Sequence, residues 1–152
     1  MHREVSDYII GYISRTRKNS QQVIQMLLEE EGVEGIDPSH GTILSVLLEK
    51  EGPMQMKEIA KLTRRDKSTI TSLVNRIEKE GYVKKVKSIE DRRVTYIELT
   101  ERGLALKEPF FNISTRLIDI AYGEFEPQER LELLRLLKKM NKSFYKALSE
   151  TR

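Results

Sequence analysis

The sequence contains no cysteine. This absence excludes disulfides, thiolate metal sites, cysteine nucleophiles and redox sensing by a thiol. No apolar run approaches the ~20 residues that a membrane-spanning helix needs. The N-terminal segment also lacks the uninterrupted apolar core of a signal peptide. We therefore expect a cytoplasmic protein with no membrane partner.

The chain has only two histidines, His2 and His40, and we expect neither to bind a metal. His2 lies at the chain terminus, and His40 lies near a predicted helix start, where a surface or capping role is expected. The acidic runs Glu29–Glu31 and Glu49–Glu51 are typical of solvated helix ends. Nothing resembles a nucleophile elbow, a phosphate-binding glycine loop or a metal triad. We therefore expect neither an enzyme nor a required cofactor.

The charge distribution is uneven, although the net charge of the 152 residues is only +3. Residues Gln55 to Thr95 hold twelve Lys and Arg against six Asp and Glu, a local charge of +6, and the rest of the chain carries −3. A basic middle between near-neutral flanks is typical of a nucleic-acid-binding module on a separate scaffold. From charge alone, a solvated basic face is the alternative.

Apolar residues recur at helical spacing in the N-terminal part of the chain. A first helix is predicted from Val5 to Leu28, and the glycines and like charges that follow break it. Asp37 is positioned to cap a second helix that has Pro38 at its first position. This second helix is predicted to end at Gly52-Pro53.

Two short helices joined by a polar turn follow. The first is predicted around Lys57 to Leu62, with Ile59, Ala60 and Leu62 buried. Asp66 caps the second, and Gly81 marks its exit. Its inward stripe consists of Ile70, Leu73, Val74 and Ile77. This arrangement predicts a helix-turn-helix.

Two strands are predicted directly after it, over Tyr82–Lys87 and Val94–Leu99. Their connection, SIEDRR, is a polar tip with two arginines. A helix-turn-helix followed by a basic hairpin is the order of a winged helix. We therefore predict a mainly α fold with a small β-hairpin wing.

The C-terminal part is again helical. Thr100 is expected to cap a helix that runs to about Tyr122, and Pro127 opens the last one. Pro109 cannot donate a hydrogen bond to the carbonyl of Ala105, so we predict a kink or a break between these residues. The long first and last helices have more apolar surface than a small winged domain covers, which indicates a homodimer; packing within a monomer is the alternative.

The outward face of the fourth predicted helix is suited to DNA. Short polar side chains allow a helix to lie deep in the major groove, and hydroxyl groups suit phosphate or base contacts. Asn75 is a candidate reader of adenine and Arg76 of guanine. An ordinary solvent-facing surface is the alternative. The candidate residues on this helix are Lys67, Ser68, Thr69, Thr71, Ser72, Asn75 and Arg76.

Arg92 and Arg93 lie at the hairpin tip beside Asp91. An arginine on a narrow projecting ribbon can enter the minor groove, where negative potential is concentrated. Asp91 is expected to hold one of the two guanidinium groups in position. Considered alone, the hairpin also fits a simple surface ion pair.

Residues 56–103 resemble the core of MarR-type regulators in the helix-turn-helix, the Asp-Arg-Arg wing tip and the Leu-Thr-Glu-x-Gly entry to the next helix. The order of the flanking helices also fits. The resemblance implies a triangular homodimer with the fourth helix in the major groove and the wing in the minor groove. By position, Asp91 and Arg93 match the Asp-x-Arg pair of the family's wing. Pro109 departs from the family's usually uninterrupted fifth helix, and we hypothesise that the resulting kink changes the angle between dimer arms and DNA-binding heads.

The resemblance also implies a small aromatic or anionic effector whose binding lowers DNA affinity, and it favours repression over activation. We therefore predict a ligand-responsive, sequence-specific repressor that binds double-stranded DNA as a homodimer at a pseudo-palindromic site. Residues 37–103 would form the DNA-binding domain, and residues 1–36 and 104–152 the dimerisation region. The alternative is a winged-helix module for protein partners, which an acidic or apolar face on the fourth helix would have favoured.

Overall fold

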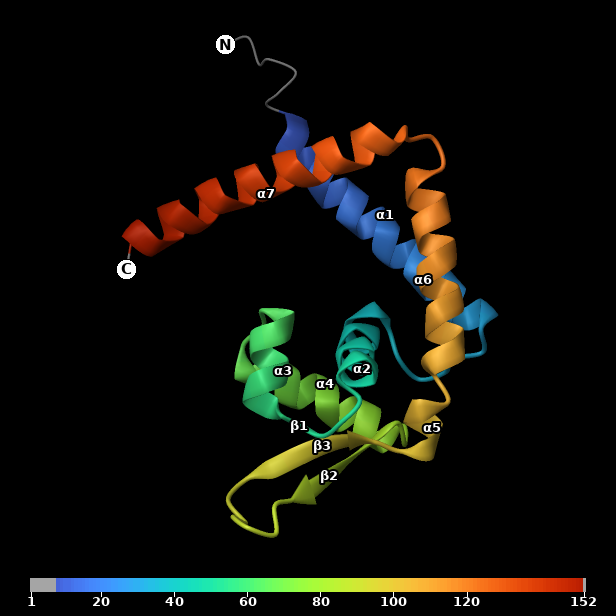
Figure 1. Ribbon diagram of the computed structural model, residues 1–152, viewed down its shortest axis with the longest axis vertical. Helices are drawn as coiled ribbons and strands as arrows, with labels where there is room; N and C mark the ends of the chain where they lie inside the picture. The colour runs from blue at the N-terminus through green and yellow to red at the C-terminus, as the bar shows by residue number, and fades with distance from the viewer. Residues whose placement is uncertain (1–7, 152) are drawn as a thin grey trace. The chain divides into compact units, whose positions relative to one another are not determined.

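A computed structural model describes residues 8–151 of the chain. Its elements confirm a mainly helical fold with a small antiparallel sheet (Figure 1). In chain order they are α1 (Ile9–Glu30), α2 (Pro38–Lys50), β1 (Met54–Gln55), α3 (Met56–Thr63), α4 (Lys67–Lys79), β2 (Val83–Lys87), β3 (Thr95–Leu99), α5 (Glu101–Leu104), α6 (Lys107–Tyr122) and α7 (Pro127–Glu150). His2 and the predicted start of the first helix at Val5 lie outside the described residues.

The chain divides into two compact units, one up to Thr115 and the other from Arg116 onward. In the first unit, α2, α3 and α4 pack on one another and on the sheet. Close packing of apolar side chains drives this arrangement and fixes the helices. The fully buried side chains include Leu27, Ile43, Leu44, Leu47, Ile59, Ile70, Val74, Ile77 and Ile97.

The sheet has three antiparallel strands in the order β1-β3-β2. The predicted hairpin is confirmed, and Val83 pairs with Leu99 at its base. β1 was not predicted, because two residues are too short to show an alternating pattern. It forms because Met54 lies opposite Ile97 on β3 and both side chains are buried. This pairing ties the entry to α3 to the base of the wing.

The predicted start of α2 is confirmed by hydrogen bonds. The Asp37 carboxylate accepts from the Ser39 and His40 N–H groups at the start of α2. His40 completes the cap, because its Nδ1 accepts from the Asp37 N–H at 3.1 Å. His40 is therefore a capping residue.

The predicted burial of Leu62 is wrong, since 54% of this side chain is exposed. The inward stripe of α3 instead passes through Met56, Ile59, Ala60 and Thr63, at the spacing i, i+3, i+4, i+7. Thr63 tolerates this position because its hydroxyl donates to the Ile59 carbonyl at 2.7 Å. Leu62 lies to one side of the stripe.

The predicted interruption before Pro109 is confirmed as a break. α5 ends at Leu104 and α6 begins at Lys107. Pro109 thus takes the third position of α6, where a backbone N–H would have no partner within the helix. Thr100 caps α5 as predicted, because its hydroxyl oxygen accepts from the Gly103 N–H at 3.1 Å.

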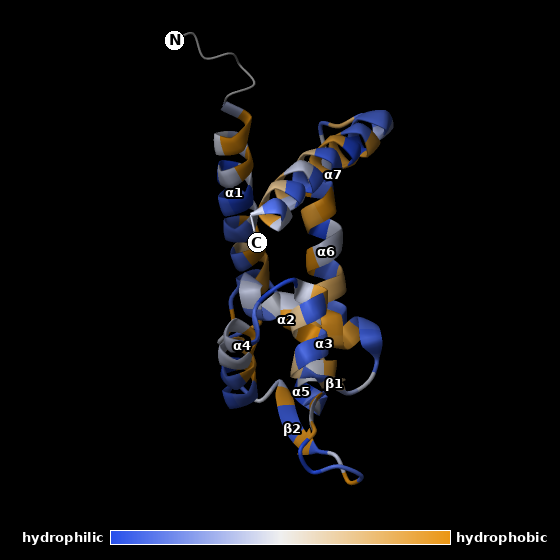
Figure 2. Ribbon diagram, turned by 90° about the vertical axis from the view of Figure 1, so that its left-hand side faces the viewer, coloured by the Kyte–Doolittle hydropathy of each residue, from blue (hydrophilic) through white to orange (hydrophobic). Residues whose placement is uncertain are grey.

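The second unit contains the C-terminal part of α6 and all of α7. Its turn is held by Tyr122, whose ring stacks edge-on with Phe125 at 5.4 Å and lies under the Arg130 guanidinium. No residue of α7 is buried, although apolar residues recur along its length (Figure 2). Its exposed apolar side chains include Leu131, Leu134, Leu137, Phe144 and Leu148. Within a single chain this apolar stripe is uncovered.

None of the described helices combines the length and the apolar content needed to cross a bilayer.

Gly103 has a packing role that gives a first prediction. A Cβ at this position would collide with the Tyr82 carbonyl oxygen. We expect Gly103→Ala to lower the free energy of unfolding by about 1–3 kcal/mol, because backbone must move to admit the methyl group. Urea denaturation measures the change.

Gly41 provides the matched control, because it lies inside α2 and a Cβ there would meet nothing within 4 Å. Gly41→Ala should stabilise the protein by up to about 1 kcal/mol through helix propensity. Equal effects of the two substitutions would contradict the packing argument.

Candidate nucleic-acid interface

The outward face of α4 is set by its buried stripe. Ile70, Val74 and Ile77 are fully buried, as predicted, and Leu73 is half-buried. The opposite face therefore points to solvent. Of the predicted contact residues, Thr69 and Thr71 are half-buried and the others on α4 are exposed: Lys67, Ser68, Ser72, Asn75 and Arg76.

Asp66 organises the N-terminal turn of α4. Its carboxylate accepts from Ser68 Oγ at 2.6 Å, from the Thr69 N–H at 2.8 Å and from Thr69 Oγ1 at 2.9 Å. These hydrogen bonds, the one from Ser68 most of all, lower the pKa of Asp66 from 3.8 to about 2. The cap is therefore ionised at neutral pH.

This network determines what the hydroxyl groups can offer to a ligand. Ser68 and Thr69 give their protons to Asp66, and Thr71 gives its proton to the Lys67 carbonyl at 2.8 Å. All three hydroxyls therefore present lone pairs outward, which accept hydrogen bonds. Among the described residues, the side chains of Lys67 and Ser72 on α4 have no polar partner, so both can donate to a ligand.

A lysine of the wing fixes the orientation of the Asn75 side chain. Lys85, on β2, donates to Asn75 Oδ1 at 2.6 Å, and its Nζ lies 3.6 Å from Glu78 Oε1. One amide oxygen lone pair and both N–H donors of Asn75 remain for a ligand. The side chain is exposed and its orientation is fixed by Lys85.

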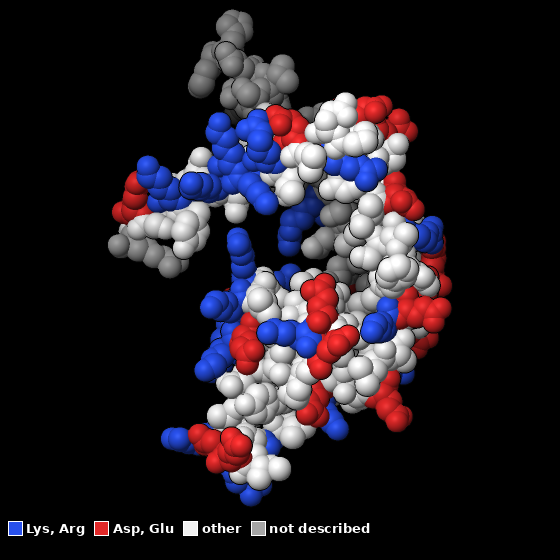
Figure 3. Space-filling view, viewed as in Figure 1, with Lys and Arg blue, Asp and Glu red and all other residues white. Residues whose placement is uncertain are grey.

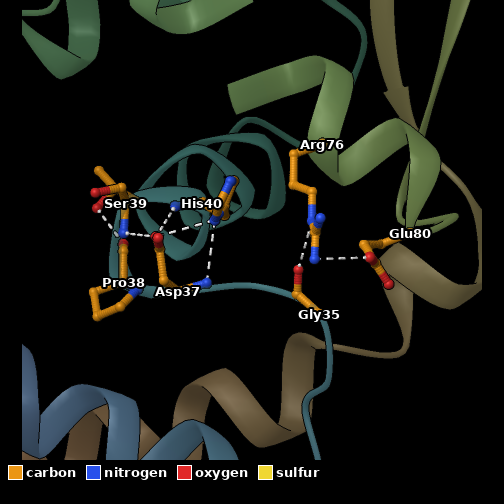
Figure 4. A network of polar contacts seen from close by, with 8 residues as sticks. Gly35, Asp37, Pro38, Ser39, His40, Arg76 and Glu80 are labelled. Carbon is orange, nitrogen blue, oxygen red and sulfur yellow. Dashed lines mark hydrogen bonds and ion pairs between the residues drawn. The ribbon is translucent and has the colours of Figure 1, made fainter. Parts of the chain in front are cut away.

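The Arg76 guanidinium is bound within the protein and is not free to read a base. Its Nε donates to the Gly35 carbonyl at 3.1 Å, and a terminal nitrogen lies 3.2 Å from Glu80 Oε1 (Figure 4). Gly35 has φ +78° and lies against Glu80, where a Cβ would collide. Arg76 thus fastens α4 to the α1–α2 loop.

Tyr82 makes a second connection to the same loop, one that the sequence did not reveal. Its hydroxyl donates to the Glu34 carbonyl at 2.8 Å and accepts from Arg102 at 3.2 Å. The Arg102 guanidinium also lies over the Tyr82 ring, 4.6 Å from its centroid. No sequence signal pairs these residues, because they are 20 and 48 positions apart.

The wing tip presents an ordered arginine. Arg93 donates from Nε and from a terminal nitrogen to the two carboxylate oxygens of Asp91, each at 3.0 Å. These bonds lower the pKa of Asp91 and raise that of Arg93. The Arg93 side chain is nevertheless 91% exposed. Asp91 therefore aims the guanidinium as predicted and leaves three of its N–H donors free; Arg92 is exposed beside it.

Basic atoms gather along α7 (Figure 3). The exposed basic residues of α7 are Arg130, Arg135, Lys138, Lys139, Lys142 and Lys146. No group of three His, Cys, Asp or Glu side chains within residues 8–151 could hold a metal ion.

A cavity of about 340 Å³ opens in the first unit, where α2, β3 and α5 meet. Its apolar wall consists of Leu48, Pro53, Leu99 and Leu104. Glu51, Glu98 and Lys107 lie at its polar side, and Lys107 Nζ lies 3.8 Å from Glu51 Oε1. The size and the mixed lining suit a small organic molecule.

The Asp66 network gives a pH prediction. Because the folded-state pKa is lowered from 3.8 to about 2, ionised Asp66 stabilises the fold above pH 3.8, and this stabilisation is lost as the pH falls through about 2. Ser68→Ala removes the strongest hydrogen bond and should raise the pKa of Asp66 toward 3.8. NMR titration of the carboxyl carbon measures the value. Ser72→Ala is the control and should leave it unchanged; a wild-type pKa in the Ser68 variant would refute the network.

The contacts of Arg76 give a second prediction. Arg76→Ala should lower the free energy of unfolding by about 1 kcal/mol, because it removes the hydrogen bond to Gly35. DNA affinity should fall without a change in preference at any one base pair, since Arg76 itself contacts no base. Glu80→Gln keeps the Gly35 bond and should cost less. A relaxed preference at a single G·C pair, with stability intact, would instead make Arg76 a base reader.

Comparison with known proteins agrees with this geometry. The MarR family model matches residues 34–94. The HTH-type transcriptional regulator SarZ of Staphylococcus saprophyticus is 33% identical over 107 residues, which cover 68% of this chain and 70% of SarZ. The HTH-type transcriptional repressor NicR of Pseudomonas putida is 32% identical over 93 residues, which cover 61% of this chain and 59% of NicR.

Solved structures share the fold. The Staphylococcus aureus MepR–DNA complex matches with a TM-score of 0.77 and 23% identity, over 93% of this chain and 99% of MepR. Bordetella bronchiseptica BpsR, studied for regulation of its DNA binding by 6-hydroxynicotinic acid, matches with a TM-score of 0.77 and 20% identity, over 93% of this chain and 98% of BpsR. The chain has a winged helix-turn-helix with the Asp91–Arg93 pair at its wing tip, and it is related to a transcriptional regulator over two thirds of its length. It therefore belongs to the MarR family of transcriptional regulators.

Proposed function

We propose that this protein is a sequence-specific, ligand-responsive DNA-binding regulator that acts as a homodimer. The observation that carries the proposal is the pairing of an exposed, short-chained polar face on α4 with an ordered arginine at the wing tip. Residues 37–103 form the DNA-binding domain in this proposal, and residues 1–36 and 104–152 the dimerisation region. MepR, which shares the fold, has been solved as a DNA complex.

In the major groove, the face of α4 divides into donors and acceptors. Lys67 and Ser72 donate to phosphate oxygens, which only accept. Ser68 and Thr69, whose protons are held by Asp66, accept from base amino groups such as cytosine N4 or adenine N6. Asn75 donates from Nδ2 to adenine N7 and accepts at its remaining lone pair. Arg76 positions the helix.

In the minor groove, Arg93 supplies a charge that is already oriented. Asp91 holds two of its N–H groups, so little side-chain entropy is lost when the other donors bind. Arg92 provides a second cation beside it. The negative potential of a narrow minor groove favours both guanidinium groups.

Dimerisation would cover apolar surface that is exposed in the single chain. This surface includes Tyr8 just before α1, Ile9 and Tyr12 on α1, and Leu137 and Phe144 on α7. Patches of this kind mark interfaces in soluble proteins. A symmetric dimer would place two α4 helices about 34 Å apart and would read an inverted repeat.

The effector is proposed to be a small aromatic or anionic molecule. BpsR has the same fold, and its DNA binding is regulated by 6-hydroxynicotinic acid. The cavity beside Leu104 and Lys107 is a candidate site, with an apolar wall for a ring and an ammonium group for an anion. Repression is proposed because the relative NicR is a repressor. Titrating aromatic acids into the protein–DNA complex tests the response.

The alternative, a winged helix for protein partners, is not favoured. Such a role calls for an apolar or acidic face on α4, whereas the exposed residues there are Lys67, Ser68, Ser72, Asn75 and Arg76. The MarR family assignment also favours DNA.

Removal of the wing charge tests the proposal. Arg93→Ala should weaken DNA binding and reduce the slope of log K against log salt by about 0.9, the contribution of one phosphate contact. Arg135→Ala is the matched control, because Arg135 also pairs with a carboxylate, that of Glu132, but lies on α7. Fluorescence anisotropy over a range of salt concentrations gives both quantities. An unchanged affinity and slope for Arg93→Ala would remove the wing from the mechanism.

Interruption of the α7 stripe tests dimerisation. Phe144→Glu places a charge among the exposed apolar residues of α7 and should release monomers that bind DNA poorly. Lys142→Glu, which changes charge on the basic face of the same helix, should leave the dimer intact. Sedimentation equilibrium distinguishes the two states. An intact Phe144→Glu dimer would exclude this stripe as the interface.

A further inference from the structure

Ile89 is the most exposed large apolar side chain of the described residues. It lies at the wing tip with 100% of its surface exposed, whereas the next value is 73%, for Tyr145. Val86, on the same hairpin, is only 36% exposed. Ile89 therefore contributes no packing to the folded chain, and its apolar surface is wholly available to a ligand.

The tip that carries Ile89 is an ordered turn. Ser88 N–H donates to the Val94 carbonyl at 2.9 Å, and Val94 N–H donates to the Asp91 carbonyl at 3.0 Å. Asp91 N–H donates to Ser88 Oγ at 3.3 Å. These bonds hold the backbone on both sides of Ile89, so the isoleucine is displayed at a fixed place on the wing.

The charges around Ile89 limit what it can contact. Lys87, Arg92 and Arg93 lie within four residues of it, and the acidic residues beside them are Glu90 and Asp91. Arg93 already engages the Asp91 charge, so basic side chains outnumber acidic ones at the tip. The matching surface is apolar and bordered by negative charge. The minor groove of DNA has this character, because deoxyribose carbons form its walls and phosphates line its edges. Isoleucine is one of the apolar side chains that proteins insert into the minor groove.

We propose that Ile89 is a DNA-contacting residue of the wing, and that it packs against the deoxyribose walls of the minor groove beside Arg93. The inference rests on the proposed function and adds an apolar contact to its arginine. Arg93 supplies attraction that depends on salt, and Ile89 supplies attraction that does not.

The two kinds of contact have different signatures. Burial of an isoleucine side chain that is fully exposed in the free protein should raise affinity about tenfold. Because no counterion is released by an apolar contact, the gain should be the same at every salt concentration. Because Ile89 has no internal contacts, its replacement should leave the unfolding temperature unchanged.

The test compares Ile89→Ala, Ile89→Leu and Arg93→Ala on one operator duplex over a range of salt concentrations. We expect Ile89→Ala to bind about tenfold more weakly with the wild-type salt slope and the wild-type Tm. Ile89→Leu keeps the apolar surface and should bind nearly as well as the wild type.

Two results would overturn the inference. If Ile89→Ala binds like the wild type while Arg93→Ala loses affinity and slope, the inference is wrong and the proposed function stands. If Ile89→Ala keeps DNA binding but loses regulation in a transcription assay, the side chain contacts a protein instead. Failure of the wild-type protein to bind duplex DNA would refute the proposed function itself.

Discussion

The burial of one stripe of α4 determines the rest of the proposed interface. Ile70, Val74 and Ile77 are fully buried, and α4 packs against α2, α3 and β2. A helix held on one face by close packing has no freedom to rotate. Its opposite face is therefore fixed as well, and the residues there form a rigid surface for the major groove.

Polar contacts refine this placement at both ends of α4. Asp66 holds the first turn and turns the Ser68 and Thr69 hydroxyls into acceptors. Arg76 fastens the other end to the Gly35 carbonyl. On the wing, Asp91 orients Arg93 in the same way. At the start of α4 and at the wing tip, a charged side chain of the chain itself determines what its neighbour offers to DNA, whereas Arg76 only positions the helix.

Much of this was predictable from the sequence, because periodicity, caps and glycine exits are local signals. They placed Asp66, Gly81, the hairpin and the break before Pro109. Local signals could not place Arg76, because its partner Gly35 is 41 positions away. They also missed β1, which exists only through its pairing with β3, and they misplaced Leu62, since Thr63 completes the α3 stripe. Contacts between distant segments set the position of Arg76 and of β1.

The central claim is that the protein reads a DNA sequence as a symmetric dimer. Selection of bound sequences from random duplex DNA with the purified protein tests it most directly. The account predicts an inverted repeat whose half-sites lie about one helical turn apart, with α4 reading the repeat. Recovery of a single unrepeated half-site, or of no preferred sequence from effector-free protein, would contradict it.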